Sequence, residues 1–290
     1  MARRKCNPAE SRPPQKKCIF CGKGGEPGNR MSDEHLWSDW MGQYFNRTPG
    51  DEYYEFKTNV QAKQRFKSDP SFLKVKQGSA NTKKFHVVCS KCNREWMSEY
   101  ENAVIPILTP MLLGQKIALD EQMRRRLVAW LVLKLLVAEH HAQADHPADP
   151  IFSEQHRTDF MDNGTIPDGI RIWVAKCGRG NWVSAFYRQS IGMTASTKPE
   201  LSAGVDRSSK TVQSVTWGIG MALFHISATT DPTVYPGLDL FGVGAIRRLW
   251  PLRDRDMTWP PMLGITEADA DSLTRTLEDL LQAPHVVAAP

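Results

Sequence analysis

The longest apolar stretch of the chain is Leu127–Ala138, twelve residues that are interrupted by the single charge of Lys134. Apolar residues occupy almost every side of the helical wheel here, which predicts a helix that is buried on several sides. Asp120 precedes the run as an N-cap, so we expect this helix from Glu121 to about His141. Twelve residues are too short to span a bilayer, which indicates a core helix.

Shorter patterns precede this helix. The segment Leu36–Phe45 places aromatic and apolar residues at helical spacing. Residues 53–88 contain more alternating and aromatic positions and predict two or three strands, the last ending in Phe85–Val88. A further helix is expected from about Asn93 towards Val104, and Pro106 and Pro110 are expected to break it.

The C-terminal half predicts a mixture of helices and strands. A polar stretch with two prolines, Ala144–Pro150, marks a domain boundary. Beyond it we expect a short helix near Ser153–Met161 and a final helix from Thr266 to about Gln282. Strand-like runs lie between these helices, at Ile170–Ala175, Trp182–Tyr187 and Val212–Ile226. Together these elements indicate the α+β fold class.

Charge is distributed unevenly, although the formal net charge is only +5. Residues 1–100 hold 19 Lys/Arg against 11 Asp/Glu, whereas the remaining 190 residues hold 18 against 21. The basic part indicates a polyanionic partner, and a solvated basic surface is the alternative. Residues 1–17 are basic and proline-containing, which is typical of a flexible arm and unlike a signal peptide. We therefore expect a cytoplasmic protein without membrane association.

Four of the six cysteines form two pairs, Cys18-x-x-Cys21 and Cys89-x-x-Cys92. Four thiolates are the usual closed ligand shell of a structural Zn²⁺, and paired knuckles of this kind favour zinc over disulfides. Four unligated buried cysteines are the alternative interpretation. Cys6 and Cys177 have no partner motif and receive no role.

Between and beside these pairs lie Glu34-His35 and, directly after the last cysteine, Asn93. With this order of residues the chain resembles the HNH endonuclease family over residues 18–104, and the segment CNREWMSEYE resembles a largely uncharacterised bacterial branch of it. The resemblance implies a treble-clef ββα-metal core that hydrolyses DNA. It also implies that His35 activates water, and that Glu34 and Asn93 hold a catalytic Mg²⁺ or Mn²⁺.

The residue types suit that chemistry. An imidazole can accept a proton from water near neutral pH. Oxygen ligands such as those of Glu34 and Asn93 suit a hard cation, which can bind a phosphate and stabilise the leaving oxygen. Zinc prefers the thiolates, so ligand softness would sort the two metals into separate sites.

The chain departs from the family pattern at three places. A glutamate precedes His35, where aspartate is commoner. The family's middle asparagine should lie about five residues before Cys89, where this chain has Lys84, and Asn81 lies three residues earlier. A later histidine of the helix is replaced by Trp96 and Met97. Both an active and an inactive site therefore stay open.

Two further groups of residues have competing interpretations. Lys83, Lys84 and Arg94 are candidates for binding nucleic acid, with a solvated sheet face as the alternative. A histidine-rich segment could suggest another metal site, but a helix end followed by a solvated linker explains it better. Its members are His140, His141, His146 and His156.

The expected organisation has four parts: a flexible basic arm at 1–17, a zinc-framed nuclease module at 18–104, a helical layer at 105–145 and an α+β domain at 146–290. The last part is expected to recognise the substrate or a protein partner, by analogy with phage-defence and mobile-element proteins. The sequence leaves DNA versus RNA preference and oligomeric state undetermined. The rival hypothesis is a non-catalytic treble-clef zinc module that binds nucleic acid or a protein.

Overall fold

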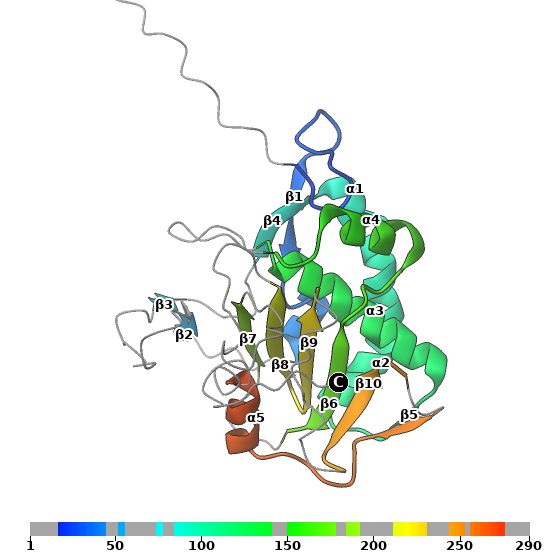
Figure 1. The fold of residues 1–290 in the computed structure, drawn as a ribbon, viewed down its shortest axis with the longest axis vertical. Coiled ribbons are helices and arrows are strands. Elements are labelled where there is room, and N and C mark those ends of the chain that lie inside the picture. Colours follow the sequence, from blue (N-terminus) through cyan, green and yellow to red (C-terminus); the bar gives the residue numbers. More distant parts are fainter. Residues whose placement is uncertain are drawn as a thin grey trace, which may run out of the picture.

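The structure is a computed structural model that describes residues 17–44, 84–140, 150–177, 211–230, 244–252 and 256–275, together with three further strands. It is a mixed α+β fold, as the sequence predicts, and its strands pair antiparallel. Figure 1 shows the largest sheet with helices packed beside it, and the small two-stranded sheet of β1 and β4 near one end of the molecule.

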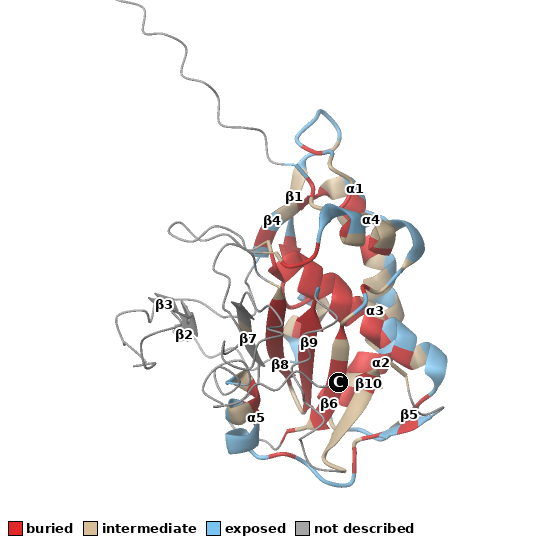
Figure 2. Ribbon diagram, in the orientation of Figure 1, coloured by how far each residue is buried: buried red, intermediate tan, exposed pale blue. Residues whose placement is uncertain are grey.

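The largest sheet has five strands in the order β10-β6-β9-β8-β7. These are β6 (Arg171–Lys176), β7 (Ser184–Ile191), β8 (Val212–Ile219), β9 (Ala222–Thr229) and β10 (Ile246–Trp250). Every residue of β8 and β9 is buried, so both faces of the sheet are covered at its centre (Figure 2).

The predicted single run Val212–Ile226 is in fact the hairpin of β8 and β9. Gly220 makes the turn with a φ of +55°, and a Cβ atom there would lie 2.6 Å from the carbonyl oxygen of Leu112. Met221 donates its backbone N–H to the same oxygen at 3.0 Å. A glycine is therefore required both by the left-handed backbone and by the close approach of the helix end.

Two long helices, α2 (Trp96–Leu112) and α3 (Glu121–Ala138), pack against each other. The predicted N-cap of α3 is confirmed, because Asp120 Oδ1 accepts a hydrogen bond from the Met123 N–H at 2.7 Å. Trp130 of α3 stacks on Trp217 of β8 with ring centroids 5.1 Å apart, which places α3 against the main sheet. Twelve of its residues are buried, as the apolar wheel predicts.

The predicted break at Pro106 and Pro110 is wrong, because both prolines lie inside α2. An interior proline costs a helix about 3 kcal/mol. The helix also buries apolar side chains that favour the continued conformation by about 1.5–3 kcal/mol each. They are Met97, Val104, Ile107, Leu108, Met111 and Leu112. The burial of these side chains therefore offsets the local tendency of the two prolines to end the helix.

The predicted helix at Leu36–Phe45 is also largely wrong. The strand β1 (Met31–His35) ends directly before it, and only a short 3₁₀ helix η1 (Asp39–Gln43) follows. Trp37 packs edge-on against Trp217 at 5.4 Å, and Ser38 bonds to a carboxylate of α2 at 2.6 Å. These contacts to distant elements decide the backbone path of the segment.

The remaining predictions hold more closely. The N-terminal strands are β2 (Glu52–Glu55), β3 (Lys74–Gln77) and β4 (Lys84–Cys89), and β4 continues into the short helix α1 (Ser90–Arg94). The helices α4 (Glu154–Asn163) and α5 (Glu267–Thr274) begin after the capping residues Ser153 and Thr266. A small sheet pairs β5 (Ile117–Leu119) with β11 (Met257–Trp259). Residues beyond 275 lie outside the described part of the chain.

One cluster of buried hydrophobic side chains draws on both sides of the predicted boundary at residue 146. Trp37 from the N-terminal part reaches Trp217, and Arg157 of α4 donates to the carbonyl oxygen of Ile19 at 2.8 Å. The predicted boundary segment Ala144–Pro150 lies, except for Pro150, outside the described residues. In the described ranges, no helix is long and apolar enough to cross a membrane.

The buried His225 makes stability sensitive to acid. Burial lowers the pKa of His225 to about 3, from an unfolded value near 6.5. Its stabilising contribution is complete above the unfolded pKa and is lost as the pH falls from about 6.5 towards 3. We expect His225→Gln, which can keep a hydrogen bond to Thr216, to flatten the pH dependence of the unfolding free energy by about 1 kcal/mol per pH unit there. Equal slopes in denaturant unfolding of both proteins would contradict this.

Candidate zinc centre and the hairpin beside it

The four paired cysteines come from two segments that are far apart in the sequence. Cys18 and Cys21 lie in a turn where Gly22 takes a φ of +67° and donates its N–H to the Cys18 carbonyl oxygen at 3.0 Å. Cys89 ends β4 and caps α1, because its Sγ accepts from the Cys92 N–H at 3.5 Å. The helix start thus directs free N–H groups towards sulfur, which favours thiolates.

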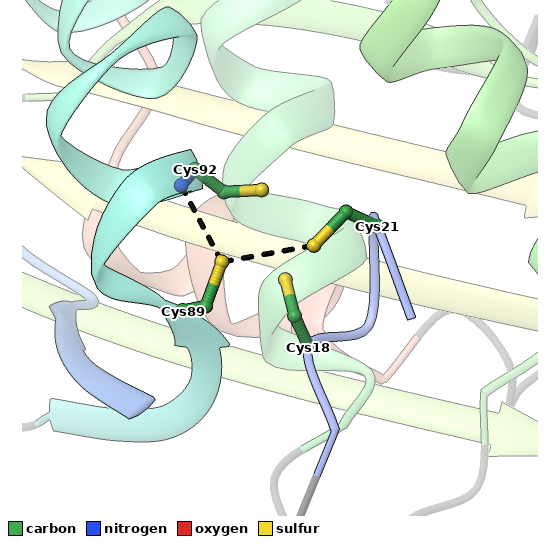
Figure 3. Close-up of side chains that lie close together, drawn as sticks. All are labelled: Cys18, Cys21, Cys89 and Cys92. Atoms are coloured by element: carbon green, nitrogen blue, oxygen red, sulfur yellow. Dashed lines mark hydrogen bonds between the residues drawn. The ribbon is translucent and has the colours of Figure 1, made fainter. Parts of the chain in front are cut away.

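The cluster has the dimensions of a tetrahedral zinc site (Figure 3). All four Sγ atoms lie within 4.8 Å of one another, and those of Cys21 and Cys89 are 3.7 Å apart. Zinc–sulfur bonds of about 2.3 Å in a tetrahedron place neighbouring sulfurs roughly 3.8 Å apart. The residues therefore fit a Zn²⁺ ion, and they are the one such group of ligands among the described residues.

Hydrogen bonds within the cluster shift the pKa values of its thiols in opposite directions. The pKa of Cys18 is lowered to about 4, because the Cys92 thiol donates to its sulfur. The same hydrogen bond raises the pKa of Cys92, and burial raises it further. A bound Zn²⁺ would hold all four sulfurs as thiolates and would couple ion binding to folding.

Next to the cluster, β1 and β4 pair as a two-stranded antiparallel sheet with an irregular register. The strands β2 and β3 lie between them in the sequence, and the pair of β1 and β4 is called the β1–β4 hairpin below. Glu34 is paired with Phe85 and His35 with Lys84, and the register shifts between Ser32 and Glu34. Glu34 and Phe85 are both buried, and Lys84 is exposed. Because paired residues of a hairpin share a face, the two faces differ: one meets the core and the other carries His35 and Lys84.

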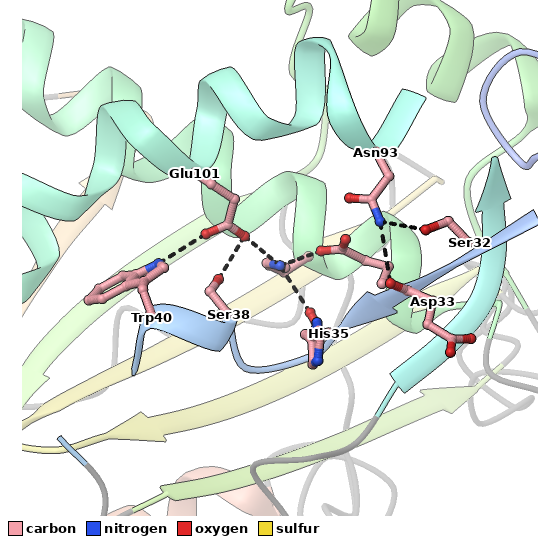
Figure 4. A network of polar contacts seen from close by, with 9 residues as sticks. Ser32, Asp33, His35, Ser38, Trp40, Asn93 and Glu101 are labelled. Atoms are coloured by element: carbon pink, nitrogen blue, oxygen red, sulfur yellow. Dashed lines mark hydrogen bonds and ion pairs between the residues drawn. The ribbon is translucent and has the colours of Figure 1, made fainter. Parts of the chain in front are cut away.

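On the core face, Lys134 of α3 brings two carboxylates together (Figure 4). Its ammonium forms ion pairs with Glu34 Oε1 and, at 2.6 Å, with Glu101 Oε1, and it donates to the His35 carbonyl oxygen at 2.9 Å. These three acceptors match the three hydrogens of an ammonium group. Ser38 Oγ and Trp40 Nε1 donate to Glu101 at 2.6 and 3.2 Å.

The charges of this network stabilise one another. Burial alone would lower the pKa of Lys134, but Glu101 and Glu34 outweigh it and raise that pKa. Burial would likewise raise the pKa of Glu101, but Lys134 outweighs it and lowers that pKa. Both groups therefore stay ionised at neutral pH inside the protein, where an unpaired charge is costly.

Asn93 ties α1 to β1. Its side-chain amide donates to Ser32 Oγ at 3.1 Å and to the Asp33 carbonyl oxygen at 3.3 Å. The structure thus places the side chain of Asn93 against Ser32 and Asp33, the two residues directly before Glu34. It does not bring the three side chains to one point: Glu34 is bound to Lys134, and the His35 ring points away from Asn93 (Figure 4).

A pair that sequence reasoning missed lies on the other face of the hairpin. His86 Nδ1 and Asp33 Oδ1 are 3.0 Å apart, and their side chains are 48% and 55% exposed. The signal in the sequence was the alternation Lys84-Phe85-His86, which predicts that Lys84 and His86 share a face. The contact of His86 with Asp33 depends on the register shift between β1 and β4, which no pattern in the sequence predicts.

The other candidate residues are placed as follows. Lys84 and Arg94 are exposed near the hairpin, and Lys83 lies outside the described residues. His140 is next to the C-terminus of α3, and burial lowers its pKa to about 4. His156 bonds to Ser153 in the cap of α4, whereas His141 and His146 lie outside the described ranges.

We expect Cys92→Ser to lose zinc and folded protein together, because binding of the ion is coupled to folding. Cys177→Ser is a matched control, since Cys177 is equally buried but lies outside the cluster. Zinc content per folded molecule and protease resistance measure the outcome. A wild-type protein purified without stoichiometric zinc would contradict the assignment of the four cysteines as zinc ligands.

We expect Lys134→Met to destabilise the fold by roughly 3–5 kcal/mol, the usual cost of leaving buried charges unpaired. Adding Glu34→Gln and Glu101→Gln should recover much of that loss, because no uncompensated carboxylate remains. Denaturant unfolding at neutral pH compares the single and triple variants. A single variant as stable as wild type would show that the network is not coupled to folding.

No protein-family model, no curated protein and no solved structure matches this chain. Its function is therefore inferred from its own residues, contacts and charges.

Proposed function

We propose that residues 18–104 form a zinc-framed, treble-clef ββα-metal module that hydrolyses DNA phosphodiester bonds as an HNH-like endonuclease. In this proposal the four-cysteine zinc is structural. His35 is the general base, and Glu34 and Asn93 are the ligands of a catalytic Mg²⁺ or Mn²⁺.

The observation that carries the proposal is the attachment of Asn93 to β1. A hairpin, β1 with β4, runs directly into α1, and the zinc ligands Cys89 and Cys92 join the two. The hydrogen bonds from Asn93 to Ser32 and Asp33 hold the start of α1 against the strand that carries Glu34-His35. This order and proximity of hairpin, zinc and helix is what the resemblance to HNH endonucleases implies.

The chemistry divides between the groups. His35 would take a proton from water, which is the step that a positioned imidazole accelerates. Lys84 and Arg94, both exposed, would contact the phosphates. A divalent cation would stabilise charge on the leaving oxygen. Glu34 can contribute to its binding only by sharing its carboxylate with Lys134 or by exchanging partners.

The last point favours a second candidate, a non-catalytic zinc module that binds nucleic acid or a protein. Lys134 supplies Glu34 with a permanent cation inside the protein, and the three hydrogens of its ammonium group are already matched by acceptors. A carboxylate held in this way serves the fold without any divalent ion. The two candidates differ in whether the protein cuts the DNA that it binds.

We expect His35→Ala to lower the rate of DNA hydrolysis by about two to four orders of magnitude, the usual worth of a positioned base. Zinc content and DNA affinity should stay near wild type, because the imidazole lies outside the cysteine cluster. Asn93→Ala should instead raise the Mg²⁺ concentration that half-maximal activity requires. Plasmid nicking over Mg²⁺ and Mn²⁺ titrations measures both effects.

Wild-type protein that binds DNA without cutting it, across both metals, would favour the non-catalytic module. If His35→Ala cuts DNA as fast as wild type, the protein is still an endonuclease, but His35 is not its general base.

A further inference from the structure

The knuckle turn, residues 18–23, carries the first cysteine pair and is held at its middle by two distant elements. Ile19 lies between the two cysteines, and its backbone N–H donates to the Val87 carbonyl oxygen of β4 at 3.0 Å. Its own carbonyl oxygen accepts a hydrogen bond from Arg157 Nε of α4 at 2.8 Å. Arg157 comes 138 positions after Ile19 in the sequence. Both polar groups of this one residue are therefore fixed from outside the turn.

The guanidinium of Arg157 is enclosed by protein. The residue is 9% exposed, and its Nη1 atom donates to the Phe152 carbonyl oxygen at 2.7 Å. Burial lowers the pKa of Arg157, and the carboxylates of Glu139 and Glu154 oppose that effect. The planar fork of an arginine can bond two acceptors at once in a fixed geometry. One side chain thus connects the knuckle turn to the segment before α4.

Aromatic contacts join the same two parts of the chain. Phe20 of the knuckle turn is 2% exposed and meets Trp96 edge-on, with ring centroids 4.9 Å apart. Trp96 begins α2 and also contacts Phe160 of α4, with centroids 6.2 Å apart. The knuckle turn and α4 therefore pack against one ring, which follows the second cysteine pair in the chain.

The position of the knuckle turn matters because the four sulfurs come from two segments. Bonds within the turn close its backbone, as the Gly22 N–H does with the Cys18 carbonyl oxygen at 3.0 Å. Such bonds cannot place the turn relative to another segment. A tetrahedral site nevertheless requires its sulfurs at fixed mutual distances. Contacts from outside must supply that placement, and order that exists in advance lowers the entropy lost when the ion binds.

We propose that Arg157 is a positioning residue of the zinc site. It holds the knuckle turn where the first two thiolates complete the tetrahedron begun by Cys89 and Cys92. The zinc site then includes a residue of α4, outside the module at 18–104. Zinc affinity and the docking of α4 are coupled, because the same hydrogen bond serves both.

This inference goes beyond the proposed function, since it holds for an endonuclease and for a non-catalytic zinc module alike. It rests only on the assignment of the four cysteines as zinc ligands. An arginine that merely attached α4 to the core would behave differently. Its removal would destabilise the fold but would leave the zinc affinity of the folded molecules unchanged.

The test measures zinc affinity of the folded, full-length chain by competition with a chromophoric chelator. Arg157→Met keeps a long, unbranched side chain but loses every hydrogen-bond donor. We expect it to bind zinc about 10- to 100-fold more weakly, the usual effect of removing a residue that orients a metal ligand. Arg157→Lys keeps a cationic donor without the fork, so its zinc affinity should lie between those of Arg157→Met and wild type.

Ser153→Ala is the matched control, because it acts on the same helix through its cap. Ser153 Oγ accepts a hydrogen bond from the His156 N–H at 3.3 Å, and loss of such a cap weakens a helix. This variant should lose thermal stability while the zinc affinity of its folded molecules stays near wild type. Co²⁺ in place of zinc gives a visible spectrum that reports tetrahedral thiolate coordination. At saturating Co²⁺ that spectrum should be the same in wild type and Arg157→Met, because the arginine positions the ligands and is not one of them.

Folded Arg157→Met with the zinc affinity of wild type would overturn the proposal, and so would an equal loss of affinity in Ser153→Ala. If Arg157→Met does not fold, Arg157→Lys takes its place in the comparison, and wild-type zinc affinity of that variant overturns the proposal instead. Absence of zinc from the wild type would contradict the cysteine assignment itself. DNA cleavage is measured separately, so these outcomes leave the proposed nuclease activity to its own test.

Discussion

The buried ammonium of Lys134 joins three elements that are far apart in the sequence. It reaches Glu34 on β1, Glu101 on α2 and the backbone of His35, while its own helix lies on the main sheet. A charge without access to solvent is tolerated only where its partners are fixed, so the position of α3 constrains the hairpin and α2 together. Ser38 and Trp40 donate hydrogen bonds to the carboxylate oxygens of Glu101, which holds the chain after β1 against α2. The candidate site is therefore attached to the hydrophobic core by a polar joint rather than by apolar packing alone.

The hairpin that this joint holds has two chemically distinct faces. On its core face, the carboxylate of Glu34 is already paired with the ammonium of Lys134, and Phe85 is buried beside it. Its outward face carries the exposed side chains of Asp33, Lys84 and His86. The zinc cluster fixes where β4 ends and α1 begins, since Cys89 belongs to the strand and Cys92 to the helix. The four-cysteine cluster and Lys134 thus hold the two ends of one small unit, and both leave its outward face exposed.

This division bears on the proposed role of Glu34 as a ligand of a divalent cation. A cation bound by Glu34 must compete with Lys134, whose attraction to two carboxylates raises its pKa and keeps it charged.

Some features were determined by the sequence itself, because they depend on residues close together in the chain. The cap at Asp120, the buried wheel of Leu127–Ala138 and the two cysteine pairs are local patterns with local causes. The clustering of the pairs follows from the ligand chemistry of four thiolates.

Other features needed the tertiary structure, because their causes are distant residues. The sequence cannot show that Glu34 meets a lysine one hundred positions later, since one lysine in an apolar helix carries no sign of its partner. Nor can it show the register shift that sets Asp33 against His86, because β1 and β4 are far apart in the sequence and their pairing is a tertiary contact. For the same reason α2 continues through two prolines. Local sequence thus determined the two cysteine pairs and most helix starts, whereas long-range packing and charge pairing decided which side chains of the hairpin are buried and which are exposed.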